Sequence, residues 1–135
     1  MDVSDVGEAF LDKARESLAG AASELTNGRF NHAANRAYYA CLQAAIAALD
    51  FAGIWPPGGR DEWSHAFVQS QSSGVLIHRR KLYPAELRDA LTQTQIIREQ
   101  ADYRPTQVSR TQATRAVGRA RVVVIAVAAR AEEGR

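Results

Sequence analysis

The segment NRAYYA, residues 35–40, places one arginine and two tyrosines in a stretch that is otherwise rich in alanine and leucine. At about 100° per helical residue, Arg36 and Tyr39 share one polar stripe with Asn35, whereas Tyr38 points with the apolar side chains. Polar and ionisable side chains that line a cleft can bind a phosphate or a nucleotide base. Arg36 and Tyr39 are therefore candidate binding residues.

A second arginine lies on the core-facing side of a later segment. Arg98 continues, by a step of four residues, a row formed by Leu87, Leu91 and Thr94. A buried guanidinium needs a partner, because an unpaired charge in the interior is strongly destabilising. Asp102 stands four residues after Arg98, at the spacing of an intrahelical ion pair, and Tyr103 follows it.

These residues allow two interpretations. In the structural one, Arg36, Tyr39, Arg98 and Asp102 form a buried or half-buried polar network that pins one helix to another. In the functional one, the same side chains line a pocket for a phosphate or a base. The sequence leaves both open.

The segment RDEWSH offers a third candidate, with Arg60 and His65 five residues apart. A histidine can act as an acid or base, and an arginine can stabilise a phosphorane-like oxyanion. Alternatively, His65 only caps or packs at the start of a short helix. Asp61 and Glu62 lie nearby without a second histidine or a cysteine at ligand spacing, so we expect no metal site. No glycine-rich phosphate loop or dinucleotide fingerprint is present, so we expect no cofactor.

The elements that must position these residues are helices. Apolar residues recur at steps of three and four in the first segment, from about Asp5 to the turn TNGR, and in the last, where Ser109 and Gln112 have capping-box spacing. Asn31 is the expected N-cap of a second helix that runs to about Ala52. No segment reads as a strand. The sequence predicts an all-α, up-and-down bundle of four long helices plus one short helix.

The break between the expected helices is GIWPPGGRDE at residues 53–62, whose prolines and glycines cannot continue a helix. The short helix should follow at residues 63–70. Pro84 suits a first helical position, so the next long helix should run from there to residue 100 or 102. Residues 71–83 give the weakest pattern. The 135 residues suffice for one core, so we expect a single domain over residues 1–135.

Charge and cysteine content narrow the classes of protein. Residues 1–67 contain 5 Lys+Arg and 9 Asp+Glu, and residues 68–135 contain 12 and 6, so the second half could meet phosphate. The single cysteine, Cys41, can form no intramolecular disulfide and is expected in the core. The longest strongly apolar run, residues 122–129, is far shorter than the roughly 20 residues of a membrane span. No signal-peptide pattern is visible, so we expect a cytoplasmic protein without a membrane partner.

The segments that begin at DKARESL and contain NRAYYA, followed by SHAFV and REQADY, resemble the HEPN superfamily, named for higher eukaryote and prokaryote nucleotide-binding proteins. They are most similar to a bacterial and archaeal branch with R-x-Y-Y-A and R-x-x-A-D-Y motifs, in register over roughly residues 8–130. The resemblance implies a bundle of four or five helices. It also implies a homodimer, often encoded beside a minimal nucleotidyltransferase in toxin-antitoxin or defence pairs.

Catalytic members of this superfamily are metal-independent ribonucleases that use an arginine and a histidine four to six residues apart at the dimer interface. By position, that arginine is Arg98, but residues 99–103 contain no histidine. A carboxylate there cannot replace a neutral imidazole near pH 7 without a large pKa shift. Arg60 and His65 match the spacing in a different segment.

Three hypotheses follow. The leading one is a HEPN module that binds RNA or a nucleotide, or a partner protein, in a nucleotidyltransferase-linked toxin-antitoxin or defence system. The second is a metal-independent ribonuclease that uses Arg98 or Arg60 with His65. The third is a purely structural helical subunit. If the bundle brings His65 beside Arg98, the site combines Arg98, His65, Asp102, Tyr103, Arg36 and Tyr39.

Overall fold

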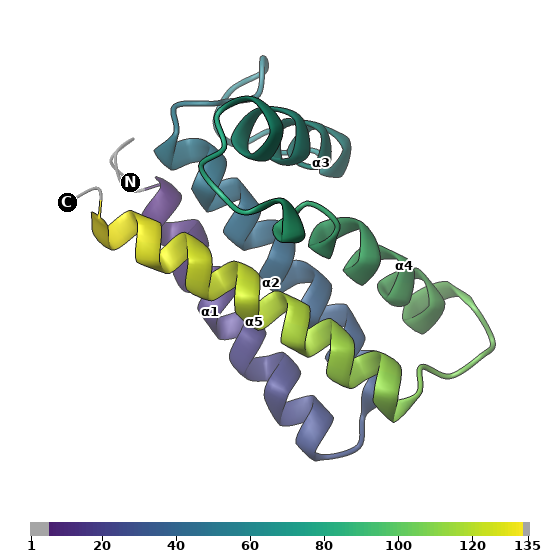
Figure 1. Ribbon diagram of the computed structural model, residues 1–135. Coiled ribbons are helices and arrows are strands. Elements are labelled where there is room, and N and C mark those ends of the chain that lie inside the picture. The colour runs from purple at the N-terminus through teal and green to yellow at the C-terminus, as the bar shows by residue number, and fades with distance from the viewer. Residues whose placement is uncertain (1–5, 134–135) are drawn as a thin grey trace.

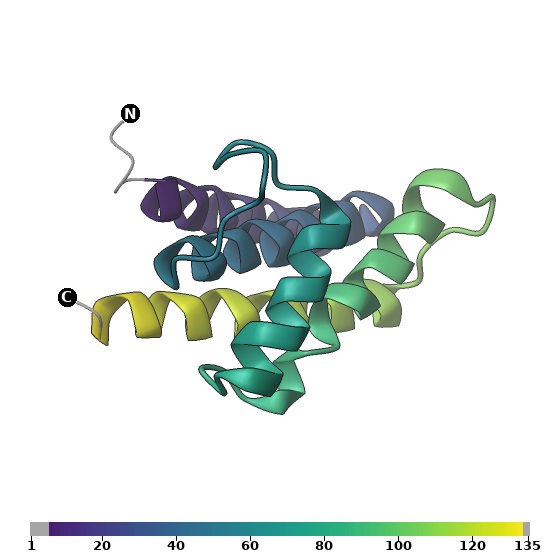
Figure 2. The same ribbon diagram turned by 90° about the horizontal axis from the view of Figure 1, so that it is seen from above.

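The computed structural model describes residues 6–133, which form helices and contain no strand. Four long helices run along the molecule (Figure 1): α1 (Val6–Thr26), α2 (Phe30–Phe51), α4 (Ala90–Tyr103) and α5 (Arg110–Glu133). The short helix α3 (His65–Gln71) and the segment after it cross this bundle, as the view from above shows (Figure 2). The predicted all-α bundle of four long helices and one short helix is confirmed.

Helix α2 is the centre of the bundle, as its nearly continuous apolar sequence predicts. It packs against α1, α3, α4 and α5. Alanines cover much of its buried surface, so the neighbouring helices can approach closely. Larger side chains fill the core between them, including Leu11, Leu49, Val68 and Val117, each 1% exposed or less. Burial of a leucine side chain contributes roughly 1.5–3 kcal/mol.

The turn between α1 and α2 ends α1 as predicted, with Gly28 at φ 76°, where glycine is favoured. The expected N-cap of α2 is wrong by two residues, because Arg29 occupies that position. Asn31 lies inside the first turn, where its Oδ1 accepts a hydrogen bond from the Val108 N–H at 2.9 Å. The Asn31 side chain therefore makes a tertiary hydrogen bond instead of the N-cap that the local sequence pattern predicts. The predicted cap at Asp5 lies outside the described residues.

The start of α3 is fixed by Ser64, whose Oγ accepts a hydrogen bond from the Phe67 N–H at 3.1 Å. The helix does not stop at residue 70, because a π-helix, η2 (Ser72–Arg79), continues it. Pro84 is not the first residue of a long helix: a single 3-10 turn, η3 (Ala85–Leu87), comes first, and α4 starts at Ala90. The weak pattern of residues 71–83 thus corresponds to irregular helical structure.

The loop from α4 to α5 is tied at both ends. The Gln112 N–H donates to Ser109 Oγ at 3.1 Å, and the Ser109 N–H donates to Gln112 Oε1 at 2.9 Å, so the predicted capping box is formed. Gln112 Nε2 also donates to Gln100 Oε1 of α4 at 3.1 Å. These contacts hold the last turn of α4 in place, and that turn carries the acidic and aromatic candidates of the site.

Among residues 6–133, no helix combines the length and the apolar character needed to cross a bilayer. Cys41 is buried and unpaired, and its packing against the other core residues confirms the predicted core role.

Candidate functional site

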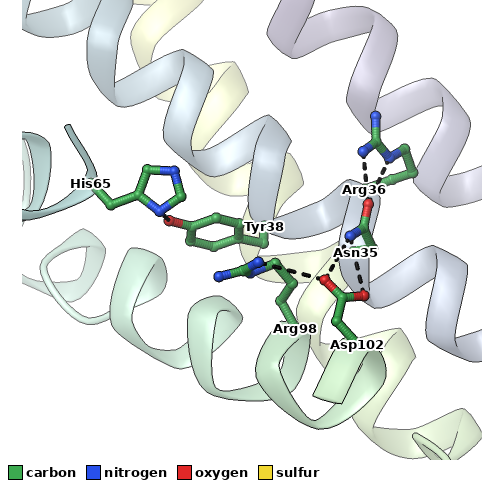
Figure 3. Close-up of polar contacts among 6 residues, drawn as sticks. All are labelled: Asn35, Arg36, Tyr38, His65, Arg98 and Asp102. Atoms are coloured by element: carbon green, nitrogen blue, oxygen red, sulfur yellow. Dashed lines mark hydrogen bonds and ion pairs between the residues drawn. The ribbon is translucent and has the colours of Figure 1, made fainter. Parts of the chain in front are cut away.

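The site is built around a contact between the core of α2 and the first residue of α3. Tyr38 is only 1% exposed, yet its hydroxyl lies 2.8 Å from Nδ1 of His65. The Ser64 cap fixes the position of His65, while Tyr38 is fixed by packing on α2. Figure 3 shows the imidazole beyond the end of the phenol ring, with its second nitrogen turned away from Tyr38. His65 itself is exposed.

The protonation of this pair follows from its surroundings. Burial raises the pKa of Tyr38 to about 12, so the phenol keeps its proton near neutral pH. Burial and the nearby Arg98 charge both lower the pKa of His65, so the imidazole is neutral there. The Tyr38 hydroxyl therefore donates to Nδ1, and the proton of His65 lies on Nε2. The site presents a histidine N–H donor to solvent.

Arg98 reaches the same place from α4. Its guanidinium carbon is 4.9 Å from the Tyr38 ring centroid, 6.0 Å from that of Tyr39 and 5.8 Å from that of Tyr103. Such placement over aromatic faces is favourable for a cation. In Figure 3 the guanidinium lies beside the Tyr38 ring, between His65 and Asp102.

The charge of Arg98 is only partly balanced. Its side chain is 11% exposed, and its Nη1 lies 3.5 Å from Asp102 Oδ2, a long hydrogen bond. Its Nε is buried without a hydrogen-bond partner among the described residues. Burial lowers the pKa of Arg98, but the neighbouring tyrosines and Asp102 outweigh this effect, so the net pKa is raised and the group stays charged.

A chain of hydrogen bonds leads from Asp102 to Arg36. Asn35 Nδ2 donates to both oxygens of Asp102, at 3.0 and 3.3 Å. Asn35 Oδ1 accepts from Nε and Nη2 of Arg36, at 3.0 and 2.7 Å. Arg36 also lies over Tyr39, 5.1 Å from its centroid. The polar network between α2 and α4 predicted from the sequence is therefore formed, with Asn35 as the bridge, but it is less buried than predicted, because Arg36 and Asp102 are exposed.

An open groove of about 510 Å³ runs beside this chain of hydrogen bonds. Its walls come from α1, α2 and the end of α4. The polar residues at its border include Ser23, Glu24, His32, Asn35, Arg36 and Asp102. Arg36 is exposed at the groove, so a ligand can reach its guanidinium from solvent.

Arg60 does not belong to this cluster. Its Nε donates to Asp50 Oδ1 at 2.9 Å, its Nη2 contacts the same oxygen, and its guanidinium covers the Trp55 ring at 4.6 Å. Asp50 is 7% exposed and also accepts a hydrogen bond from the Gly7 N–H at 3.0 Å. The predicted pairing of Arg60 with His65 is wrong, because Arg60 instead anchors the segment before α3 to α2.

Two members of the site were not among the residues selected from the sequence. The sequence pattern predicts Tyr38 as a core residue, which is correct for its ring but does not account for its hydroxyl. A buried tyrosine hydroxyl usually finds a hydrogen-bond partner, and that requirement is the available signal. Asn35 lies on the same polar stripe as Arg36 and Tyr39, but only the folded bundle shows its partner on α4.

The described residues define an all-α domain in which an arginine, a histidine and three tyrosines come together where α2, α3 and α4 meet. The family model for the HEPN domain matches residues 8–130. The chain belongs to the HEPN domain family, and the resemblance found in its sequence motifs is confirmed at the level of the family. A comparison with curated proteins gives no match.

Proposed function

We propose that the cluster of Arg98 and His65 binds a phosphate group of RNA, which makes this HEPN domain an RNA-binding module. The observation that carries the proposal is the state of Arg98, a charged guanidinium whose ion pair with Asp102 is long, at 3.5 Å. A guanidinium forms strong, often bidentate hydrogen bonds with phosphate oxygens, as it does with carboxylates. A bound phosphate would supply the missing charge.

The neighbouring groups suit a nucleic-acid strand. The Nε2–H of His65 adds a second donor beside Arg98, and Arg36 offers its charge along the adjoining groove. Tyr103 is 75% exposed at the end of α4, next to Arg98, so a base can stack on its ring. Stacking on an aromatic side chain contributes roughly 1–3 kcal/mol per base in single-strand binding.

The geometry favours binding over catalysis. A general base needs a free lone pair within reach of the proton that it removes. In His65 the Nδ1 lone pair accepts a hydrogen bond from the Tyr38 hydroxyl, and Nε2 already carries a proton. His65 is therefore prepared to donate a hydrogen bond to phosphate. The absence of a histidine at residues 99–103 points the same way.

Affinity for RNA tests this proposal. Binding of a fluorescent single-stranded RNA is measured by anisotropy for the wild type, Arg98→Gln and Arg115→Gln. Arg115 is an exposed arginine of α5, so its replacement removes the same charge away from the cluster. We expect Arg98→Gln to weaken binding at least tenfold and Arg115→Gln to change it less than twofold. Equal affinity in all three proteins would contradict the proposal.

The size of the ligand is tested with the same proteins. If RNA binds and a mononucleotide does not displace it, the result supports a ligand strand that occupies both Arg98 and the groove beside Arg36. Displacement by a mononucleotide at a similar concentration would assign the site to a nucleotide instead.

A ribonuclease is the second candidate, because the fold brings His65 beside Arg98 although the two residues are far apart in the sequence. Purified protein is incubated with RNA in EDTA. Cleavage that is lost in both Arg98→Ala and His65→Ala supports the enzyme, whereas intact RNA supports the binding module.

We further propose that the protein acts as a homodimer with a nucleotidyltransferase partner in a toxin-antitoxin or defence system. This rests on the motifs that resemble the corresponding HEPN branch. Light scattering on purified protein tests the dimer, and co-purification with the product of the adjacent gene tests the partner. A protein that is monomeric, copurifies with no nucleotidyltransferase and binds no RNA would contradict this proposal. That result would favour the hypothesis of a purely structural subunit.

A further inference from the structure

Helix α5 has an apolar surface on its outer side. Residues 122–129 form the run VVVIAVAA, which places apolar side chains on every side of the helix. A helix that is apolar all round is normally buried all round. The inner side of α5 packs on α1, α2 and α4, but the helix lies at the surface of the bundle (Figure 1). On its outer side, Val122 and Ile125 are 54% and 59% exposed.

The outer side of α5 follows a regular pattern. Its residues recur at alternating steps of three and four, which is the spacing of a helix face that packs along a second helix. We call this set the outer stripe, and its members are Arg115, Gly118, Val122, Ile125, Ala129 and Glu132. Gly118 is half-buried, and the other five are exposed. Four apolar residues thus lie in a row between a cation and an anion.

Gly118 has no role within the protomer that explains it. Glycine destabilises the interior of a helix relative to alanine. Outside its chain neighbours and the backbone of its own helix, no described atom lies within 4 Å of the place that a Cβ of Gly118 would take. A glycine on an open helix face allows a second backbone to approach closely. Gly118 therefore indicates a partner that packs directly on α5.

The outer stripe is complementary to itself when two copies of α5 run in opposite directions. A two-fold axis between residues 123 and 124 puts Val122 opposite Ile125 of the second copy, so the two largest apolar side chains meet at the centre. The same axis puts Gly118 opposite Ala129 of the second copy. This pair is small enough for the two helices to come close at both ends of the apolar row.

The charges at the ends of the stripe match in the same register. Arg115 of one copy lies level with Glu132 of the other, and the symmetry produces this ion pair twice. In a parallel pair, by contrast, Arg115 would lie beside Arg115. Glu132 also has a contact within its own chain, but a carboxylate can accept several hydrogen bonds. The charge pattern therefore favours an antiparallel second copy of this chain as the partner.

We propose that the outer stripe of α5 is the interface of an antiparallel, two-fold symmetric homodimer. This inference rests on the homodimer proposed above and names its surface. The cluster of Arg98 and His65 is built on α3 and α4 around Tyr38 of α2 and shares no residue with the stripe. Each protomer therefore keeps its own RNA site outside the interface. The stripe is a different surface from the one that the resemblance implies for catalytic members, whose arginine lies at the dimer interface.

Sedimentation equilibrium of the purified protein, without RNA, tests the apolar part of the interface. Gly118→Leu fills the open face of the helix, and Ile125→Lys puts two like charges near the two-fold axis. We expect each variant to raise the dissociation constant of the dimer at least tenfold. Ile96→Lys is the matched control, because Ile96 is 53% exposed on α4, and it should keep the wild-type constant. None of these positions is buried in the protomer, so circular dichroism should show the same helix content in all variants.

Charge reversal tests the antiparallel register. Arg115→Glu and Glu132→Arg each place like charges opposite one another at two contacts per dimer, so each should weaken the dimer about tenfold. An equimolar mixture of these two single variants restores opposite charges at both contacts. The mixture should therefore form a heterodimer whose dissociation constant lies within about threefold of the wild-type value. Only a contact between copies can produce this recovery.

The outcomes separate this inference from the proposals above. A wild-type protein that stays monomeric at every concentration would overturn both the interface and the homodimer. A dimer that neither Gly118→Leu nor Ile125→Lys weakens would overturn the interface alone. Loss of the dimer in both charge variants without recovery in their mixture would overturn the antiparallel register. The measurements contain no RNA, so their results are independent of the proposal for Arg98.

Discussion

The hydroxyl of Tyr38 lies 2.8 Å from Nδ1 of His65 and joins the buried core of α2 to the first residue of α3. This contact fixes the imidazole as a donor at Nε2. It also places His65 next to Arg98, whose guanidinium is stacked beside the same Tyr38 ring. One tyrosine therefore positions both of the charged or ionisable groups of the candidate site.

The influence of Arg98 on His65 can be measured directly. Because burial and the Arg98 charge both lower the pKa of His65, Arg98→Gln removes one cause and should raise the pKa. The measurement is an NMR titration of the His65 ring protons in both proteins. A His65 pKa that stays the same or falls in Arg98→Gln would show that the two side chains do not interact in solution.

Stability should depend on the protonation of His65. Its folded pKa is lower than the unfolded value, near 6.5, so the unfolded chain binds more protons as the pH falls below that value. The contribution of neutral His65 to the free energy of unfolding is therefore present above about pH 6.5. It is lost as the pH falls through the folded pKa. Urea midpoints measured from pH 7.5 to 5 should fall more in the wild type than in His65→Gln. Parallel curves for the two proteins would argue against a neutral, hydrogen-bonded His65.

Arg60 should matter for stability and not for RNA. Replacement of Arg60 by glutamine leaves Asp50 buried without its cation, and breaking a buried ion pair costs about 3–5 kcal/mol. Because the Arg60 side chain is 19% exposed, we expect a smaller loss than this range, about 2–3 kcal/mol, in the free energy of unfolding. RNA affinity, measured where the variant is folded, should equal that of the wild type. A loss of RNA binding in Arg60→Gln without a loss of stability would show that Arg60 belongs to the RNA-binding site.

Asp102 competes with a phosphate for Arg98. In Asp102→Asn the carboxylate charge disappears from the cluster, so RNA should bind about two- to fivefold more tightly, as expected for removal of a nearby like charge. The contacts with Asn35 and Arg98 weaken at the same time, which should lower stability by about 1 kcal/mol. Asp12→Asn, on the exposed face of α1, is the matched control. Weaker RNA binding in Asp102→Asn would mean that Asp102 orients Arg98 more than it competes.

Much of the fold could be predicted because its signals are local. The apolar surface of α2 and the reciprocal capping by Ser109 and Gln112 depend on residues within one helix or one turn. The π-helix after α3 could not be predicted, because residues 71–83 carry no clear local pattern. Asn31 shows the same limit: its local preference is an N-cap, but the Val108 N–H, 77 residues away, takes its side chain.

The candidate site was predicted unevenly for a similar reason. Arg98 and Asp102 are one helical turn apart, so their contact follows from spacing. The partner of His65 lies 27 residues earlier, across a loop whose path the sequence does not specify. Arg60 is the opposite case: its spacing from His65 suggested a pair, but the loop directs it to Asp50.

The central claim, that Arg98 binds a phosphate of RNA, is tested most directly by the salt dependence of binding. For a single strand, the slope of log affinity against log salt concentration changes by about 0.7 for each phosphate contact. We predict that Arg98→Gln reduces the magnitude of the wild-type slope by about this amount, and that Arg115→Gln leaves it unchanged. An Arg98→Gln slope equal to that of the wild type would show that Arg98 contacts no phosphate and would contradict the proposed function.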